Sequence, residues 1–317
     1  MDAVTWTAAV RTGTVSASKD RPVWDGLPAP VRVAVERVVG GPVVEARTCP
    51  GGFSPGFASV LTRADGHRVF VKAVDVDRWP ADAALHRAEA EVTAVLPASA
   101  GAPRLLGAFD DGHWVGLAFE AVDGVEPRQP WDAAELDRVV TALLARGDVP
   151  APAGLSHDHL RLGGWAALAD RRAHVAEHSP WAADHLPRLV ELEREGLAAA
   201  RGDSLVHFDL YPHNVLLTPR RVVVVDWPHA RAGAPLVDLV TLLSSAAADG
   251  HDPDPVLAAH ASRVPGGPER IDAILAAHTG FLVGGGLSVM PPGLEPIAAA
   301  KRRLGFGALP WLERRLR

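Results

Sequence analysis

The chain has 317 residues, of which 48% are apolar, and it carries a formal net charge of −6. This length and apolar content allow one large domain or two lobes with a buried core, and the single cysteine, Cys49, excludes an intrachain disulfide and a zinc site built on several thiolates. No long basic run is present, so the composition argues against a nucleic-acid partner.

The N-terminal end of the chain predicts a protein that stays in the cytoplasm. Met1-Asp2-Ala3 begins with an acid rather than with the basic start of a signal peptide. Nowhere do about 18 apolar residues follow one another without interruption, so no membrane partner is expected. Residues 1–27 are small and polar, and we predict that they form a flexible or extended lead.

The part of the chain that follows this lead predicts a sheet with one main helix. Residues 28–39 have the apolar spacing of a short amphipathic helix, and residues 81–96 have that of a longer one. Strand patterns predict five strands, at residues 43–47, 58–62, 68–74, 104–109 and 113–119. Together these elements predict an N-terminal lobe over residues 28–120.

Beyond residue 120 the sequence becomes mainly helical. Helical apolar spacing is present in seven segments, at residues 132–144, 165–178, 181–200, 236–248, 256–264, 271–281 and 295–304. Gly and Pro gather in three stretches that we predict to be loops, at residues 147–154, 251–255 and 284–293. The second predicted lobe is therefore larger and helical, and covers residues 121–317.

Lysine is rare in this chain. Of 32 basic residues only Lys19, Lys72 and Lys301 are lysines. Lys72 lies within the alternating segment 68–74, where a compact ammonium is kept although arginine is used almost everywhere else. That placement suits a contact with phosphate. Upstream, the Gly-rich segment 49–57 lies between two predicted strands, where glycines would let backbone amides approach phosphates.

The most informative segment is HFDLYPHN at residues 207–214, which is followed by the apolar run 222–225 and by Asp226. An Asp, an Asn five residues later and a second Asp after a strand offer three oxygen-bearing side chains that a short hairpin can bring together. Asp209 could accept the proton of an attacking hydroxyl, while Asn214 and Asp226 supply hard oxygen ligands for Mg²⁺. The set is typical of phosphoryl transfer.

Three segments resemble the aminoglycoside phosphotransferase family, which is related to the protein kinases: HFDLYPHN, VVVVDW at 222–227 and GAPLVDL at 233–239. The resemblance implies an α+β, protein-kinase-like two-lobed fold, with an antiparallel five-stranded sheet lobe and a larger helical lobe. It also implies that Mg²⁺ and ATP, or GTP, are the cofactors. Phe208 departs from the family, in which many members have a small residue, commonly Gly, at that position. Asp238 is expected to tie the catalytic loop to the helix that it starts.

The resemblance also assigns roles to single residues. Asp209 is the catalytic residue, and Asn214 and Asp226 are the metal ligands. Lys72 holds the nucleotide phosphates and is oriented by a glutamate of the helix 81–96, as in kinases. That helix offers Glu89 and Glu91. Glu89 is the preferred partner, because it aligns with the family glutamate when Val92 and Leu96 fill the apolar positions behind it.

Two further segments are expected to contact the nucleotide. In the Gly-rich loop, Gly52 and Ser54 are predicted to meet the phosphates, although the loop lacks the GxGxxG pattern of protein kinases. At the end of the last predicted strand, Phe119, Glu120 and Val122 correspond to the family hinge. The backbone of Glu120 and Val122 would meet the adenine edge.

The acceptor stays open within this resemblance. It implies a small molecule with a hydroxyl group, most often an antibiotic, and a metabolic kinase of choline, homoserine or sugar type is the alternative. A third possibility is a catalytically silent nucleotide-binding module. Residues 121–317 hold 24 acidic and 20 basic side chains, which is a small surplus for a polycationic substrate. The protein is expected to be a monomer or a homodimer.

Histidine and tryptophan offer weaker candidates. Two histidine-containing segments, 157–159 and 251–254, lack partners at metal-ligand spacing, and we predict that both are solvated loops or helix caps. Trp165, Trp181 and Trp311 could line a substrate cleft.

Overall fold

The computed structural model describes residues 21–49, 55–158, 161–264, 266–289 and 295–317. The chain divides into two compact units. The first, which we call the sheet unit, combines Met1–Glu126 with His213–His229, and the second, the helical unit, combines Pro127–Pro212 with Ala230–Arg317. The segment that carries Asn214 and Asp226, which we expected in the C-terminal lobe, thus belongs to the sheet unit.

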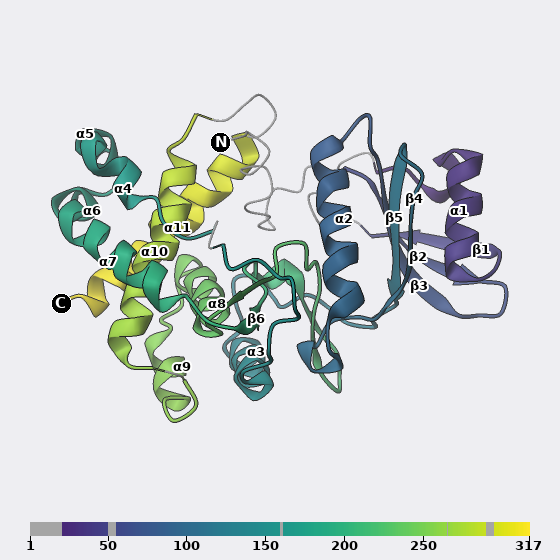
Figure 1. Ribbon diagram of the computed structural model, residues 1–317. Helices are drawn as coiled ribbons and strands as arrows, with labels where there is room; N and C mark the ends of the chain where they lie inside the picture. The colour runs from purple at the N-terminus through teal and green to yellow at the C-terminus, as the bar shows by residue number, and fades with distance from the viewer. Residues whose placement is uncertain (1–20, 50–54, 159–160, 265, 290–294) are drawn as a thin grey trace. The chain divides into compact units, whose positions relative to one another are not determined.

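The sheet unit contains one antiparallel sheet of five strands in the order β1-β2-β3-β5-β4. Its strands are β1 (Val43–Thr48), β2 (Phe57–Arg63), β3 (Arg68–Asp75), β4 (Leu105–Asp110) and β5 (Trp114–Glu120). The helices α1 (Ala29–Val39) and α2 (Pro80–Val95) lie on opposite faces of the sheet, as Figure 1 shows. The five predicted strands and both predicted helices of this lobe are therefore present.

The alternation along β3 decides on which face of the sheet each side chain lies. One hydrophobic cluster joins α1 to one face, and its members from β3 are Val69, Val71 and Ala73. The other cluster joins α2 to the opposite face, and it includes Phe70 and Val74. Lys72 has the same parity as these two residues, so its side chain emerges on the face that α2 covers.

A short hairpin completes the sheet unit. Its strands β7 (Val215–Leu217) and β8 (Val222–Val224) pair with Val215 opposite Val224. The next pair outward is Asn214 and Val225, and the amide of Val225 donates to the carbonyl of Asn214 at 2.9 Å. This register places Asn214 and Asp226 at the same end of the hairpin.

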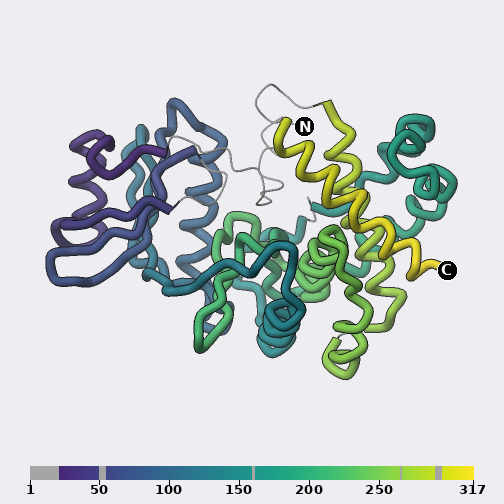
Figure 2. The backbone as a smooth tube through the Cα atoms, turned by 180° about the vertical axis from the view of Figure 1, so that it is seen from behind, coloured from purple at the N-terminus to yellow at the C-terminus, as the bar shows by residue number. Residues whose placement is uncertain are grey.

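The helical unit is built from nine described α-helices and one small β-ribbon. The ribbon pairs β6 (Ser204–Val206) with β9 (Arg231–Gly233). The helices are α3 (Ala133–Arg146), α4 (Trp165–Leu168), α5 (Arg172–Ala176), α6 (Pro180–Asp184), α7 (Leu186–Ala199), α8 (Leu236–Ala248), α9 (Asp254–Ala259), α10 (Pro268–Gly286) and α11 (Glu295–Arg315). Figure 2 follows the chain through this unit to the C-terminal end of α11.

Several helix boundaries differ from those predicted. The helix predicted over residues 181–200 is split into α6 and α7, because Pro187 has no N–H to continue the first helix and instead lies in the first turn of the second, which begins at Leu186. The predicted loop at 284–293 is helical up to Gly286. α11 continues through Pro310 to Arg315, well beyond the predicted end at residue 304.

Glycine keeps its place in α10 because α11 packs close against it. A Cβ atom on Gly285 would lie 2.5 Å from Cδ of Lys301, and one on Gly286 would lie 2.8 Å from Cα of Arg302. The lack of a side chain thus allows a close helix contact, which here outweighs the low helix propensity of glycine.

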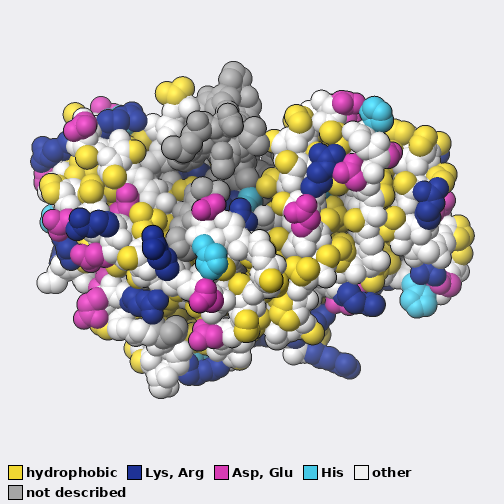
Figure 3. Space-filling view, viewed as in Figure 1, with side chains coloured by type: hydrophobic (Ala, Val, Ile, Leu, Met, Phe, Trp, Pro, Cys, Tyr) yellow, Lys and Arg dark blue, Asp and Glu magenta, His cyan; other side chains and the backbone are white. Residues whose placement is uncertain are grey.

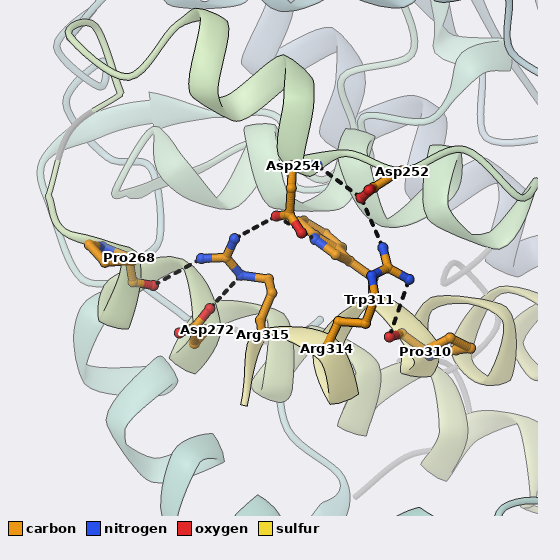
Figure 4. Close-up of polar contacts among 8 residues, drawn as sticks. All are labelled: Asp252, Asp254, Pro268, Asp272, Pro310, Trp311, Arg314 and Arg315. Atoms are coloured by element: carbon orange, nitrogen blue, oxygen red, sulfur yellow. Dashed lines mark hydrogen bonds and ion pairs between the residues drawn. The ribbon is translucent and has the colours of Figure 1, made fainter. Parts of the chain in front are cut away.

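An ion-pair network ties the ends of α9, α10 and α11 together, as Figure 4 shows. Nη1 of Arg315 lies 2.7 Å from Oδ1 of Asp254, and its Nε lies 2.5 Å from Oδ1 of Asp272. The indole N–H of Trp311 donates to the same oxygen of Asp254 at 3.0 Å. Asp252, from the segment that we predicted to be a solvated loop or cap, pairs with Arg314.

Replacing Arg315 with methionine is expected to lower the free energy of unfolding by about 1 to 3 kcal/mol, because Asp272 would lose its hydrogen-bonded partner in a half-buried position. Urea denaturation followed by circular dichroism measures the change. Arg317 is the matched control, since its side chain is 74% exposed and forms an ion pair with Glu313, four residues earlier in the chain. A loss of stability for R317M equal to that of R315M would contradict this role of the network.

Charged side chains of both signs are interspersed over the face of the molecule in Figure 3. None of the helices in the described part of the chain has the length and apolarity needed to cross a membrane.

Candidate functional site

Lys72 lies between two carboxylates of the sheet unit. Its Nζ is 3.0 Å from Oδ1 of Asp226 and forms an ion pair with Glu89. Burial favours the neutral amine, but the charges and hydrogen bonds of Asp226 and Glu89 outweigh it and raise the pKa of Lys72 above its ordinary value. The side chain is therefore a fixed cation, as a phosphate contact requires.

The structure separates the two glutamates that the sequence offered as partners of this lysine. Glu89 is buried on the face of α2 that covers the sheet, whereas Glu91 is exposed. Of the two residues that the alignment placed at apolar positions behind Glu89, Val92 is buried on the same helix, whereas Leu96 caps the C-terminal end of α2 and is half-buried. Lys72 pairs with Glu89 and not with Glu91.

The hairpin end brings two hard oxygen donors to this lysine. Asn214 is buried, and Asp226 follows β8 in a left-handed conformation with φ 66°. A non-glycine residue in that region is strained, and such strain is found mostly at functional positions. A carboxylate and an amide at one hairpin end form a donor set that fits Mg²⁺. Trp227 packs behind Asp226, with its indole N–H donating to the carbonyl of Val224 at 2.8 Å.

A pocket of the sheet unit opens at this point. Its lining residues are Lys72, Leu85, His86, Glu89, Asp226, Pro228 and His229. Three of the predicted nucleotide- and metal-binding side chains thus share one pocket.

The residues predicted to meet the adenine lie at the end of β5. Phe119 is on the α2 face, and Nζ of Lys72 is 5.9 Å from the centre of its ring. The amide of Glu120 donates to the carbonyl of Arg104, so its predicted contact with adenine depends on its carbonyl oxygen. Val122 follows β5 and is half-buried. Gly52 and Ser54 lie outside the described residues.

Asp209 belongs to the helical unit, where a buried arginine holds it. Nη1 of Arg161 is 2.6 Å from Oδ1 of Asp209, and only 8% and 2% of the two side chains are exposed. The amide of Asp209 donates to Nδ1 of His207 at 3.3 Å, so His207 supports the backbone at this position.

Asp238 fixes the backbone of the loop that carries Asp209. The carboxylate of Asp238 accepts the amides of His207 at 2.9 Å and Phe208 at 3.0 Å, and it also pairs with Arg146 at 2.9 Å. Phe208 has φ 62°, a conformation that glycine adopts without strain. Phe208, where many family members have a small residue, thus places a large side chain at a left-handed backbone position.

Further titratable groups lie near Asp209. Lys301 of α11 is fully buried, and its Nζ lies 4.0 Å from the centre of the Phe281 ring. Burial, reinforced by the charge of Arg161 and opposed by that of Asp209, lowers the pKa of Lys301 to about 7. Burial also lowers the pKa of His278 to about 3, so this histidine is neutral at physiological pH.

Replacing Lys301 with methionine is expected to stabilise the protein most at low pH. The unfolded chain holds the lysine proton up to its ordinary pKa of 10.5, while the folded chain releases it near pH 7. The wild-type stability should therefore rise with pH between these values, by up to about 1.4 kcal/mol per pH unit, and this rise should vanish in K301M. Urea denaturation across that range measures it, with R303M on the same helix as control. An unchanged pH dependence in K301M would contradict the assignment.

Sequence reasoning missed several residues of this unit. Nothing marks Arg161 in the sequence, because arginine is common throughout. Lys301 carried the signal that identified Lys72, namely the rarity of lysine. His174, Glu177 and His178 bring three ligand atoms within 4.8 Å of one another at the surface, which the histidine spacing of one helical turn could have indicated.

The remaining candidates have other roles. Trp165 and Trp311 are buried among helices, and their indole N–H groups donate to the carbonyl of Ala276 and to Asp254. Neither lines a cleft. Trp181 stacks on His185. In the segment 157–159, the amide of Asp158 donates to Oγ of Ser156. Asp158 does not belong to a group of metal-ligating side chains among the described residues.

The sequence profile of the phosphotransferase enzyme family matches residues 45–274. This match includes Lys72, Glu89, Asp209, Asn214 and Asp226. No curated protein sequence matches the chain.

Solved structures resemble the whole fold at low identity. A choline/ethanolamine kinase family protein from Mesorhizobium loti has a TM-score of 0.57 and 17% identity, and the match covers 90% of this chain and 94% of that one. An aminoglycoside phosphotransferase from Alicyclobacillus acidocaldarius has a TM-score of 0.52 and 14% identity, and the match covers 92% of this chain and 96% of that one. A macrolide 2'-phosphotransferase type I has a TM-score of 0.51 and 18% identity, and the match covers 88% of this chain and 98% of that one. The predicted α+β, protein-kinase-like fold is confirmed.

Proposed function

Because the chain belongs to the phosphotransferase enzyme family, we propose that it transfers the γ-phosphoryl group of ATP to a hydroxyl group of a small molecule. The observation that carries this proposal is the position of Lys72, which is held between Glu89 and Asp226 beside the hairpin end that bears Asn214. A largely buried cation next to a carboxylate and an amide is the arrangement that a magnesium nucleotide needs.

On the donor side, the sheet unit supplies charge and orientation. Lys72 would bind the nucleotide phosphates, and Glu89 keeps its ammonium in place. Asn214 and Asp226 would hold Mg²⁺, which when bound neutralises charge on the phosphates. Phe119 and the backbone of Glu120 and Val122 would face the base, and Gly52 and Ser54 would contact the phosphates.

On the acceptor side, Asp209 is the proposed base. The hydroxyl oxygen of the acceptor forms a bond to the γ-phosphorus, and the bond from this phosphorus to the bridging oxygen breaks. The hydroxyl proton passes to Asp209, and the nucleoside diphosphate leaves. Asp238 supports this step indirectly, because it fixes the backbone of His207 and Phe208.

We propose a hydroxylated antibiotic as the acceptor. The fold is shared by antibiotic phosphotransferases and by a choline/ethanolamine kinase family protein, so a metabolic acceptor is the second candidate. A silent nucleotide-binding module is disfavoured, since every position with a predicted role in transfer is filled.

The proposal is tested with purified protein, Mg²⁺ and ATP against hydroxylated antibiotics and common metabolites. The expected result is a product heavier by one phosphoryl group, formed by the wild type and absent with Asp226→Ala. Binding of ATP without any product, in a panel that spans both acceptor classes, would favour the silent module.

Replacing Glu89 with glutamine should raise the KM for ATP by about tenfold or more, because Lys72 loses the charge of its buried carboxylate partner and its position with it. Steady-state kinetics measures this change. Glu91 is the matched control, since it lies exposed on the same helix. Equal effects of E89Q and E91Q would show that the ion pair does not orient Lys72.

A further inference from the structure

Two histidines and a glutamate gather at the surface of the helical unit, where the short helix α5 ends. His174 belongs to α5, and Glu177 and His178 follow its last residue, Ala176. One ligand atom from each of the three side chains lies within 4.8 Å of the other two. In the described part of the chain, no second group of three His, Cys, Asp or Glu side chains comes this close together.

The backbone explains why the three side chains converge. Glu177 keeps helical angles, with φ −58° and ψ −24°, and its amide donates to the carbonyl of Ala173 at 3.3 Å. The amide of His178 donates to the carbonyl of Val175 at 3.1 Å. The helical turn thus continues past the end of α5, and side chains three and four residues apart lie on the same side of such a turn.

The spacing within the group suits a single metal ion. Nδ1 of His174 lies 3.3 Å from Oε2 of Glu177. Around an ion with metal–ligand bonds of about 2.1 Å, neighbouring ligand atoms are about 3.0 to 3.5 Å apart. An ion can therefore bind to these two atoms as they lie. The ligand atom of His178 is at most 4.8 Å from either, so a rotation of its side chain would supply the third ligand.

The group is held in place and open to solvent. The ring of His178 packs on that of Phe306 of α11, with 5.2 Å between the ring centres, and this contact occupies neither ring nitrogen. The ring nitrogens of His178 form no hydrogen bond within the segments that the structure describes. The side chains of His174 and Glu177 are 36% and 66% exposed. A metal ion could thus enter from solvent without displacing any packed side chain.

We propose that His174, Glu177 and His178 bind one divalent transition-metal ion of the zinc, nickel or copper class. Two imidazoles and one carboxylate suit these ions, whereas Mg²⁺ prefers oxygen ligands. Water completes the coordination, because three protein ligands leave a position open on the solvent side. The proposed magnesium ligands belong to the sheet unit, so this site is separate from theirs and does not depend on the proposed function.

The ion would hold the end of α5 in its helical form. A helix of five residues is marginal without other support, and these three ligands meet only while the turn is helical. Bound metal should therefore stabilise the turn and slow the exchange of the amide hydrogens of residues 177–179, which close it by donating to the carbonyls of Ala173 and Val175.

The test uses the full chain, freed of metal by a chelator and titrated with Zn²⁺ in an excess of Mg²⁺. Calorimetry should show a single bound Zn²⁺, and hydrogen exchange should become slower at residues 177–179. His178→Phe keeps a ring against Phe306 but removes the ligand, so it should weaken the binding of Zn²⁺ by about tenfold or more. The control is His185→Gln, since His185 is exposed in the same unit and does not belong to the group.

A second control addresses the proposed magnesium site. Asp226→Ala should bind Zn²⁺ as the wild type does. If Asp226→Ala loses the ion while His178→Phe keeps it, the ion binds at the hairpin and the inference fails. Binding with wild-type affinity by His178→Phe would overturn it as well, and so would unchanged exchange at residues 177–179. Circular dichroism shows whether each variant is folded, and His174→Gln carries the test if His178→Phe does not fold.

Discussion

Replacing Asp209 with asparagine should lower kcat by about 10² to 10⁴, because the acceptor hydroxyl would lose its base while the nucleotide site stays complete. The KM for ATP should change little, since Lys72, Asn214 and Asp226 all belong to the other unit of the chain. Steady-state kinetics with a phosphorylated acceptor, once one is found, measures both quantities.

Two controls make this result specific. Asp203→Asn changes an exposed aspartate just before β6, the strand that precedes Asp209, and this variant should keep wild-type kinetics. Asp209→Asn also removes a buried negative charge that pairs with Arg161, so circular dichroism must show that the variant is folded at the assay temperature. Full turnover by a folded Asp209→Asn variant would exclude Asp209 as the base.

Replacing Asp238 with asparagine is expected to cost about 3 to 5 kcal/mol of stability. Its fully buried carboxylate accepts two backbone amides and pairs with Arg146, whose side chain is 7% exposed. An asparagine offers one acceptor oxygen where two are used, and it removes the negative charge that pairs with Arg146. Urea denaturation should show a lower midpoint with an unchanged slope.

Asp249 at the other end of α8 is the matched control. It pairs with Arg303, which is 40% exposed, so Asp249→Asn should change stability by less than about 1 kcal/mol. Comparable losses for D238N and D249N would mean that the buried position adds nothing to this ion pair.

The elements of the sheet unit were predictable because their signal is local. Alternation along residues 68–74 follows from the two buried faces of β3, and the same alternation places Lys72 toward α2. In the helical unit the glycines of α10 read as a loop, since their local propensity opposes a helix. Only the contact with Lys301 and Arg302 explains why they are helical.

In the candidate site, too, local sequence patterns predicted some residues and could not predict others. The spacing from His207 to Asp226 predicted a base and two metal donors, and the choice of Glu89 depended on two apolar positions behind it, Val92 and Leu96. Arg161 could not be found by such reasoning, because its partner is 48 residues away in sequence and nothing local distinguishes it from other arginines. Long-range ion pairs of this kind appear only when the chain is folded.

The path of the chain has a consequence for shortened forms of the protein. Because residues 213–229 return to the sheet unit, a fragment that ends at Glu126 contains Lys72 and Glu89 but neither Asn214 nor Asp226. A stop codon before residue 214 would therefore produce a chain in which Lys72 keeps the carboxylate of Glu89 but lacks that of Asp226, and in which both proposed metal donors are missing. Neither unit can be obtained whole by a single cut, and a separately expressed nucleotide-binding module would need the hairpin joined to it by an engineered linker.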